Sequence, residues 1–148
     1  MGRRTKAREC AFQILYQWQV GGEPIGQVLE SFWRVRSGTP EARAMAERLA
    51  RGTAARADAL DAEIAEAATN WRIERIAPVD RTILRLGAYE LAEEDGTPAA
   101  VVLDEAVELA KRFGEADSAA FVNGVLDAIR KRVRGDAARD GAEASQKR

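Results

Sequence analysis

Apolar residues recur at intervals of three and four along most of the chain, which is the spacing of one face of an α-helix. The clearest stripe runs from residue 4 to residue 20 and consists of Ala7, Cys10, Ala11, Ile14, Leu15 and Trp18. The same spacing predicts helices over residues 25–33, 41–68, 79–93, 98–113 and 118–133, with a further short helix near residues 71–76. No segment alternates apolar and polar residues with period two. The pattern therefore predicts an all-α protein of about seven helices, arranged either as two packed clusters or as one irregular bundle.

Glycine and proline mark the predicted helix ends. "GGEP" (21–24), "SGTP" (37–40) and "EDGTP" (94–98) separate successive apolar stripes. Thr39 is a candidate N-cap with Pro40 at the first helical position. Gly52 falls inside the long predicted helix at 41–68, where it weakens the helix by about 1 kcal/mol relative to alanine, so we expect a bend or a tight contact there. After residue 134 the apolar periodicity stops, which predicts a folded domain at 1–134 and a disordered tail at 135–148.

The composition removes several classes of function. The 148 residues include one cysteine and no histidine, so an intramolecular disulfide, a cysteine zinc cluster and a Ser-His or Cys-His nucleophile are all excluded. Paired carboxylates such as Asp104 and Glu105 are adjacent in sequence and diverge on a helix, and we find no Walker A sequence and no GxGxxG loop. We therefore predict a protein that is not an enzyme and holds no cofactor or metal. No apolar run approaches the roughly 20 residues that span a bilayer, so we expect a cytoplasmic protein.

Charge is distributed unevenly, although the formal net charge is only −1. The first eight residues carry +4, residues 9–129 carry −9 and residues 130–148 carry +4. Basic ends on an acidic body predict an anionic partner at one surface and a basic protein at another. Terminal charges that merely keep the chain ends soluble explain the pattern equally well at this point.

The start of the chain combines cations with aromatic rings. The four bases are Arg3, Arg4, Lys6 and Arg8. Phe12 and Tyr16 follow Arg8 at helical spacing and lie away from the centre of the apolar stripe, which predicts an outward-facing flank with a base and two rings. Such a flank suits RNA, because bases neutralise phosphates and exposed rings stack unpaired nucleobases. A wider apolar face would instead bury Phe12.

Two further segments are candidates for function. In "EADSAAFVNGVLDAI" (115–129), Gly124 stands inside a predicted helix, so we expect close approach there by another helix or, less often, by a ligand. Phe121 follows a predicted helix N-terminus that suits an anion, and Asp117 is a candidate cap or a group that selects a base. In "PVDRTILRLGAYEL" (78–91), we expect most charged residues, including Arg85 and Glu90, to form a solvated face.

Three segments, in order, resemble the NusB family of bacterial transcription antitermination factors: "RRTKARECAFQILYQW", "DRTILRLGAYEL" and "EAVELAKRFGEADSAAFVNGVLDAI". The resemblance spans residues 3–133. It implies an all-α fold of two packed helical subdomains and no enzymatic activity. It also implies binding to boxA-type leader RNA of ribosomal RNA operons together with the small-subunit ribosomal protein NusE, in a complex with NusA, NusG and RNA polymerase.

The resemblance assigns roles to particular positions. The family's arginine-rich start falls on Arg3, Arg4, Lys6 and Arg8, and its RNA-facing aromatic on Tyr16. A second RNA-contacting patch falls on Lys111, Asp117 and Phe121, and an acidic residue used against NusE falls on Asp80. Thr5, Ala119 and Ala120 depart from the basic or polar groups of other members, so we expect RNA binding by the chain alone to be weak and dependent on its partner.

Two alternatives remain open from the sequence. One is the NusB-like RNA-binding domain fused to ribosomal RNA cytosine methyltransferases, although no methyltransferase segment accompanies these residues. The other is a homodimeric interaction module that buries the first helix. Sequence-specific DNA binding is disfavoured, because no compact helix-turn-helix with a polar recognition helix is evident.

Overall fold

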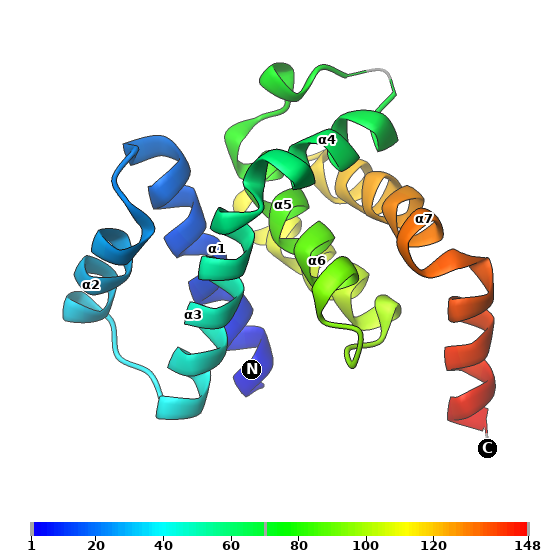
Figure 1. The fold of residues 1–148 in the computed structure, drawn as a ribbon, viewed down its shortest axis with the longest axis horizontal. Coiled ribbons are helices and arrows are strands. Elements are labelled where there is room, and N and C mark those ends of the chain that lie inside the picture. The colour runs from blue at the N-terminus through cyan, green and yellow to red at the C-terminus, as the bar shows by residue number, and fades with distance from the viewer. Residues whose placement is uncertain (1, 70, 148) are drawn as a thin grey trace.

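The computed structural model describes residues 2–69 and 71–147, with side chains described as far as residue 135. These residues form seven α-helices and one 3₁₀ turn, and no strand occurs among them, which confirms the predicted all-α class (Figure 1). The elements in chain order are α1 (Arg3–Gly21), α2 (Ile25–Val35), α3 (Pro40–Ala55), α4 (Ala57–Ala67), η1 (Ile73–Arg75), α5 (Pro78–Glu93), α6 (Ala99–Phe113) and α7 (Ser118–Lys147).

The helices form two clusters that share one core. Figure 1 shows α1, α2 and α3 on one side and α4 to α7 on the other, as the two-subdomain prediction requires. Helix α5 joins the clusters, because it packs against α1 and α3 as well as against α4, α6 and α7. A single cluster of buried apolar side chains runs through both halves, so neither half has a separate core.

Local chemistry explains two of the helix boundaries. The Thr39 side chain accepts a hydrogen bond from the Ala42 N–H at 3.1 Å, which confirms the predicted N-cap of α3. At the end of α1, Gly22 adopts a left-handed conformation (φ 77°) and its N–H donates to the Trp18 carbonyl at 3.1 Å. A residue without Cβ takes this conformation without strain, so the "GGEP" segment ends the helix.

The long helix predicted at residues 41–68 is two helices. The chain leaves helical geometry at Arg56 (φ −111°, ψ 15°), where α3 ends and α4 begins. The break therefore does not fall at Gly52. Gly52 instead makes the tight contact that was the other expectation, because a Cβ added there would collide with the ring and hydroxyl of Tyr89 on α5. The periodicity of the segment could not reveal the break, since alanine and arginine favour helix on both sides of it.

Helix α5 is buried on nearly all sides, and its expected solvated face is wrong. Arg85 and Glu90 retain only 7% and 2% exposure. Each has an oppositely charged partner on another helix, which offsets the loss of hydration that burial imposes. Arg85 donates from Nε and Nη2 to the two carboxylate oxygens of Asp61 on α4, at 2.7 and 2.6 Å. Glu90 accepts from Arg8 on α1.

Helix α7 has a break at Gly135, where φ is 72° and ψ is 164°. This is the residue at which the folded domain was expected to end. Just before it, Arg134 donates to the Leu91 and Thr97 carbonyls at 3.0 and 2.6 Å, so α7 is tied to the end of α5. The backbone continues as helix to Lys147. The predicted disordered tail falls on residues whose side chains lie outside the description, and it stays a prediction.

Candidate nucleic-acid interface

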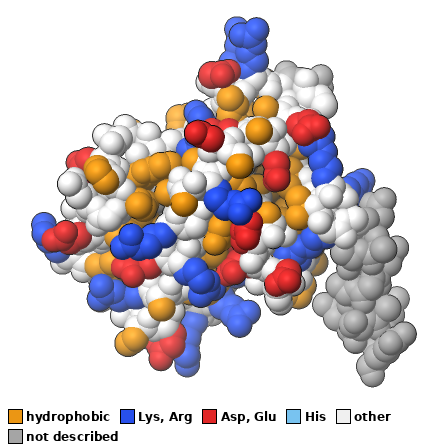
Figure 2. Space-filling view, viewed as in Figure 1, with side chains coloured by type: hydrophobic (Ala, Val, Ile, Leu, Met, Phe, Trp, Pro, Cys, Tyr) orange, Lys and Arg blue, Asp and Glu red, His pale blue; other side chains and the backbone are white. Residues whose placement is uncertain are grey.

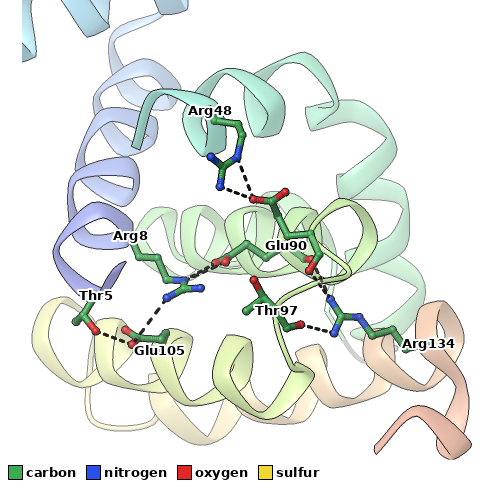
Figure 3. A network of polar contacts seen from close by, with 8 residues as sticks. Thr5, Arg8, Arg48, Glu90, Thr97, Glu105 and Arg134 are labelled. Atoms are coloured by element: carbon green, nitrogen blue, oxygen red, sulfur yellow. Dashed lines mark hydrogen bonds and ion pairs between the residues drawn. The ribbon is translucent and has the colours of Figure 1, made fainter. Parts of the chain in front are cut away.

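Arg8, expected on an RNA-facing flank, lies inside the molecule with 2% exposure. Its Nε donates to both carboxylate oxygens of Glu90 on α5, at 2.9 and 3.0 Å. Glu105 of α6 lies 3.9 Å from Arg8 Nη1 and also accepts a hydrogen bond from Thr5 at 2.6 Å (Figure 3). The predicted outward position of Arg8 is therefore wrong. Carboxylates from two other helices, more than 80 residues away in sequence, hold it inside.

Burial governs the electrostatics of this network. It raises the pKa of Glu90 above the ordinary value of 4.5, while the charge of Arg8 and its hydrogen bond act in the opposite direction. Arg8 Nη2 is buried and has no hydrogen-bond partner. Thr5, which departs from the family's basic run, anchors α1 to α6. The network therefore joins three helices.

Phe12 is also buried, with 3% exposure, so its predicted outward position is wrong as well. Its ring packs between Phe113 of α6, 5.0 Å away between centroids, and Tyr16, 6.3 Å away. Tyr16 itself is half-buried. These rings line a surface groove of about 490 Å³, which we call the Tyr16 groove. Its lining includes Phe12, Tyr16, Phe32, Val35, Arg36 and Phe113.

Arg36 supplies the only cation among the described residues that line the Tyr16 groove, and no acid lines it. Its Nη1 donates to the Gln13 side chain at 2.6 Å, and its guanidinium lies 5.2 Å from the centroid of the Phe32 ring. Burial raises the pKa of the nearby Cys10 thiol, while the charges of Arg36 and Lys6 act to lower it. The charge of Glu9 acts in the same direction as burial.

Phe121 lies in a second groove of about 510 Å³, which we call the Phe121 groove. Its lining includes Trp71, Ile76, Asp80, Glu115, Asp117 and Phe121. Phe121 is half-buried and meets the more exposed Trp71 edge-on, with 6.2 Å between ring centroids. Asp117 is exposed at the rim. The structure thus brings together two of the three residues of the second predicted patch.

Asp80, the predicted NusE contact, is 8% exposed and lines the Phe121 groove. Burial raises its pKa above the ordinary 3.8; the Ser118 side chain opposes this with a hydrogen bond, and the negative charges of Asp117 and Glu115 add to it. Its Oδ1 is buried without a hydrogen-bond partner. The groups that act on Asp80 therefore lie at and just before the start of α7. A role of Asp80 against NusE stays a prediction.

Both grooves border the first turn of α5. Val79 lines the Tyr16 groove, and the adjacent Ala77 and Asp80 line the Phe121 groove. Tyr16 and Phe121, more than 100 residues apart in the chain, are each half-buried in a groove that reaches this helix N-terminus. A shared RNA surface stays a prediction.

The first basic residues lie elsewhere. Arg3 and Arg4 are exposed and line a third groove, together with Glu41, Arg48, Glu94 and Asp95. Arg3 and Tyr16 are separated by about 20 Å along α1, at a rise of about 1.5 Å per residue. Three bases and three acids balance one another in this groove. On the face shown in Figure 2, positive and negative side chains are likewise interspersed.

Lys111 is exposed in the last turn of α6, next to Phe113, which lines the Tyr16 groove. It lies 3.5 Å from Glu108, also exposed, and a pair so open to water holds its lysine weakly. Arg112 pairs with Glu9 of α1 at 2.7 Å and lies over the Phe113 ring. The C-terminal end of α6 therefore exposes Lys111, which lines neither groove.

Gly124 has an unexpected environment. It is exposed, and a Cβ added to it would have no atom within 4 Å beyond its own helix. Close packing by another helix of this chain, which was the commoner expectation, is therefore wrong. The adjacent Asn123 is exposed as well. Nothing in the fold accounts for a glycine at this position.

Sequence reasoning missed Trp71, Phe113 and Arg36 as groove residues. Trp71 is 54% exposed, whereas the sequence placed it only in a short predicted helix near residues 71–76. Phe113 belongs to an apolar stripe that suggested only core packing. Arg36 follows α2 immediately, and nothing in its neighbours indicated a groove.

Among the residues that the structure describes, no cluster of acidic or cysteine side chains is arranged to hold a metal ion. Within the same part of the chain, every helix is too short or too polar to cross a membrane.

The fold is that of an all-helical protein with two surface grooves, each lined by partly exposed rings and one cation among the described residues. The chain belongs to the NusB family, whose model matches residues 5–131. It is 52% identical over 129 residues to the transcription antitermination protein NusB of Sorangium cellulosum, covering 87% of this chain and 92% of that protein.

Solved structures agree with this assignment. A crystal form of T. maritima NusB superposes with a TM-score of 0.80 at 36% identity, covering 88% of this chain and 92% of that one. A crystal structure of the antitermination factors NusB and NusE in complex with double-stranded RNA superposes with a TM-score of 0.82 at 30% identity, covering 89% and 98%. The chain therefore shares both sequence and fold with this family.

Proposed function

We propose that this protein is a transcription antitermination factor that binds boxA-type leader RNA of ribosomal RNA operons together with NusE. The observation that carries the proposal is likeness over nearly the whole length of a transcription antitermination protein, at 52% identity. A neighbouring structure that contains NusB, NusE and RNA supports the two partners. Binding, rather than a chemical step, is then the whole of its activity.

The grooves support a specific binding mode. Bases stack against Tyr16 and against the Trp71–Phe121 pair, because exposed rings accept any nucleobase and each stack contributes about 1–3 kcal/mol. The exposed Lys6 and Lys111 neutralise phosphates of the bound strand. Arg8 and Phe12 act beneath this surface, as supports of α1, and do not touch RNA.

Acidic residues limit how RNA reaches the second groove. Asp80, Glu115 and Asp117 line it and repel phosphates, with Arg75 as the one cation among its described lining residues. A base edge, which carries hydrogen-bond donors, suits this groove better than a phosphate. RNA binding by the chain alone is therefore weak, and NusE supplies the missing affinity. In the cytoplasm the complex then acts on RNA polymerase with NusA and NusG to suppress premature termination.

The test is binding of a short, labelled, single-stranded boxA-type RNA, measured by fluorescence anisotropy across a salt titration with and without NusE. We expect weak binding alone and tight binding with NusE. Scrambled RNA, a duplex of the same sequence and the matching single-stranded DNA are the controls. Equal affinity for the scrambled RNA in the presence of NusE contradicts the proposal.

Variants test the surface. Tyr16→Leu and Phe121→Leu keep apolar volume but remove the stacking ring, so each weakens RNA binding by about 5- to 100-fold. Lys111→Gln weakens it and lowers the salt dependence. Lys131→Gln is the matched control, because Lys131 is an exposed lysine that pairs with Asp127 of its own helix at 3.8 Å, as Lys111 pairs with Glu108, and the family resemblance gives it no RNA contact. Light scattering with and without RNA shows whether a homodimer competes.

A further inference from the structure

The Tyr16 groove has the composition of a site for one anion attached to one flat apolar group. Its floor is formed by the rings of Phe12, Phe32 and Phe113. Tyr16 and the highly exposed Val35 stand at its edge. One arginine and no carboxylate line it among the described residues, so its electrostatic potential favours a negative group.

Arg36 is a groove residue to which the family resemblance assigned no role. It follows α2 in extended geometry (φ −121°, ψ 143°), and its N–H donates to the Phe32 carbonyl at 3.1 Å, which fixes its backbone. Its guanidinium is held over the Phe32 ring and by Gln13. Because both contacts are with uncharged groups, the positive charge of Arg36 is not neutralised by them.

Arg34 differs from Arg36 because its charge is paired with a carboxylate. It lies on the same helix, two residues earlier, and forms an ion pair with Glu30 at 2.7 Å. For Arg36 no carboxylate lies within ion-pair distance among the residues that the structure describes. An arginine has five N–H donors. In Arg36, Nη1 donates to Gln13, and no other guanidinium nitrogen is buried without a partner. Donors of Arg36 are therefore available to a ligand.

We propose that Arg36 is a phosphate-binding residue of the RNA surface, and that the Tyr16 groove holds one unpaired nucleotide with its base against Tyr16 and its phosphate on Arg36. This inference rests on the proposed function. Arg36 thus occupies the role that the sequence assigned to Arg8.

The size of the groove and its single cation among the described lining residues suit one nucleotide. A volume of about 490 Å³ is in the range of small-ligand sites. An RNA strand brings one phosphate for each base, which matches one cation beside one ring.

The experiment compares Arg36→Gln with Arg34→Gln in the full chain, using the labelled boxA-type RNA and NusE. We expect Arg36→Gln to weaken binding by about 3- to 10-fold and to lower the slope of log affinity against log salt by about 0.7, the value for one phosphate contact with a single strand. Arg34→Gln leaves both quantities unchanged. Arg36→Lys keeps the salt slope, because the charge remains, and recovers part of the affinity.

Further readouts separate the possible outcomes. The thermal unfolding midpoint of Arg36→Gln stays at the wild-type value, whereas a structural role would lower it and leave the salt slope intact. If wild-type protein binds RNA and the two glutamine variants bind equally, Arg36 is not a contact and the proposed function stands. If wild-type protein with NusE binds no RNA, both the function and the inference are overturned. A changed mass in light scattering with unchanged RNA affinity assigns the groove to a second copy and also overturns the inference.

Discussion

The Nε of Arg8 on α1 donates to both carboxylate oxygens of Glu90 on α5, and both side chains are 97–98% removed from solvent. This pair connects the two helical clusters at their centre. A buried pair of this kind adds little net stability over an apolar pair of similar volume, but the loss of one partner leaves a buried charge uncompensated. Arg8 is therefore a structural residue in a segment whose other bases are exposed.

Replacement of Arg8 by methionine should lower the free energy of unfolding by about 3–5 kcal/mol, because Glu90 remains buried without its cation. The double variant Arg8→Met/Glu90→Leu should recover most of this loss, since both charges are removed. Urea unfolding measures both effects. Arg4→Met, on the same helix but exposed, is the control and should change stability little. Wild-type stability of Arg8→Met combined with a reduced RNA salt slope would show instead that Arg8 contacts phosphate.

Asp61 should stabilise the fold at neutral pH and lose this effect in acid. Burial acts to raise its pKa, but hydrogen bonds and charges of Arg85 and Arg81 outweigh burial, so the pKa lies below 3.8. Its contribution is thus present above pH 3.8 and disappears as the pH falls through the lowered value. Asp61→Asn should cost about 1–3 kcal/mol at neutral pH. The difference between wild type and variant, followed by urea unfolding against pH, should shrink in acid; a constant difference contradicts the assignment.

Asp80 should have the opposite pH dependence. Burial raises its pKa above 3.8, so its contribution to stability is present below that pH and is lost as the pH rises through the raised value. Asp80→Asn cannot ionise. Its stability relative to wild type should therefore increase as the pH rises through this window, as measured by thermal unfolding. Asp104→Asn, an exposed position on α6, is the control and should show no such trend. A wild-type pH profile for Asp80→Asn would contradict the prediction.

Replacement by alanine should change the stability of the fold in opposite directions at two glycines inside helices. At Gly52 the new Cβ would collide with the Tyr89 ring, and overpacking of this kind destabilises by about 1–3 kcal/mol. At Gly124 the space is open, so alanine should stabilise by about 0.5–1 kcal/mol through its better helix propensity. Differential scanning calorimetry of both variants gives the comparison. If Gly124→Ala is destabilising, the helix there is not in ordinary geometry. If it stabilises the fold but weakens RNA or NusE binding, a partner approaches the helix at this glycine.

The chain's own periodicity determined where most helices lie, because helix formation and termination depend on residues within a few positions. Thr39 and Pro40 begin α3, and Gly22 ends α1, through contacts within one helical turn. The break at Arg56 was not predictable in this way, because its neighbours favour helix on both sides. Helix α4 takes a different direction from α3 through its packing against α5 and α7. The rings of Tyr16 and Phe121 were identified from the sequence as surface groups, and the two grooves that hold them, both bordering the start of α5, came from the fold.

By itself, the sequence determined the all-helical class, the family resemblance and the identity of the side chains that stack or carry charge. Only the tertiary structure decided which of those side chains reach solvent. Helical spacing shows which residues share a face of one helix, but it does not show which other helices cover that face. Arg8 is buried because Glu90 and Glu105 face it from other helices. Arg36 lines a surface groove in which, among the residues that the structure describes, no acidic side chain faces it.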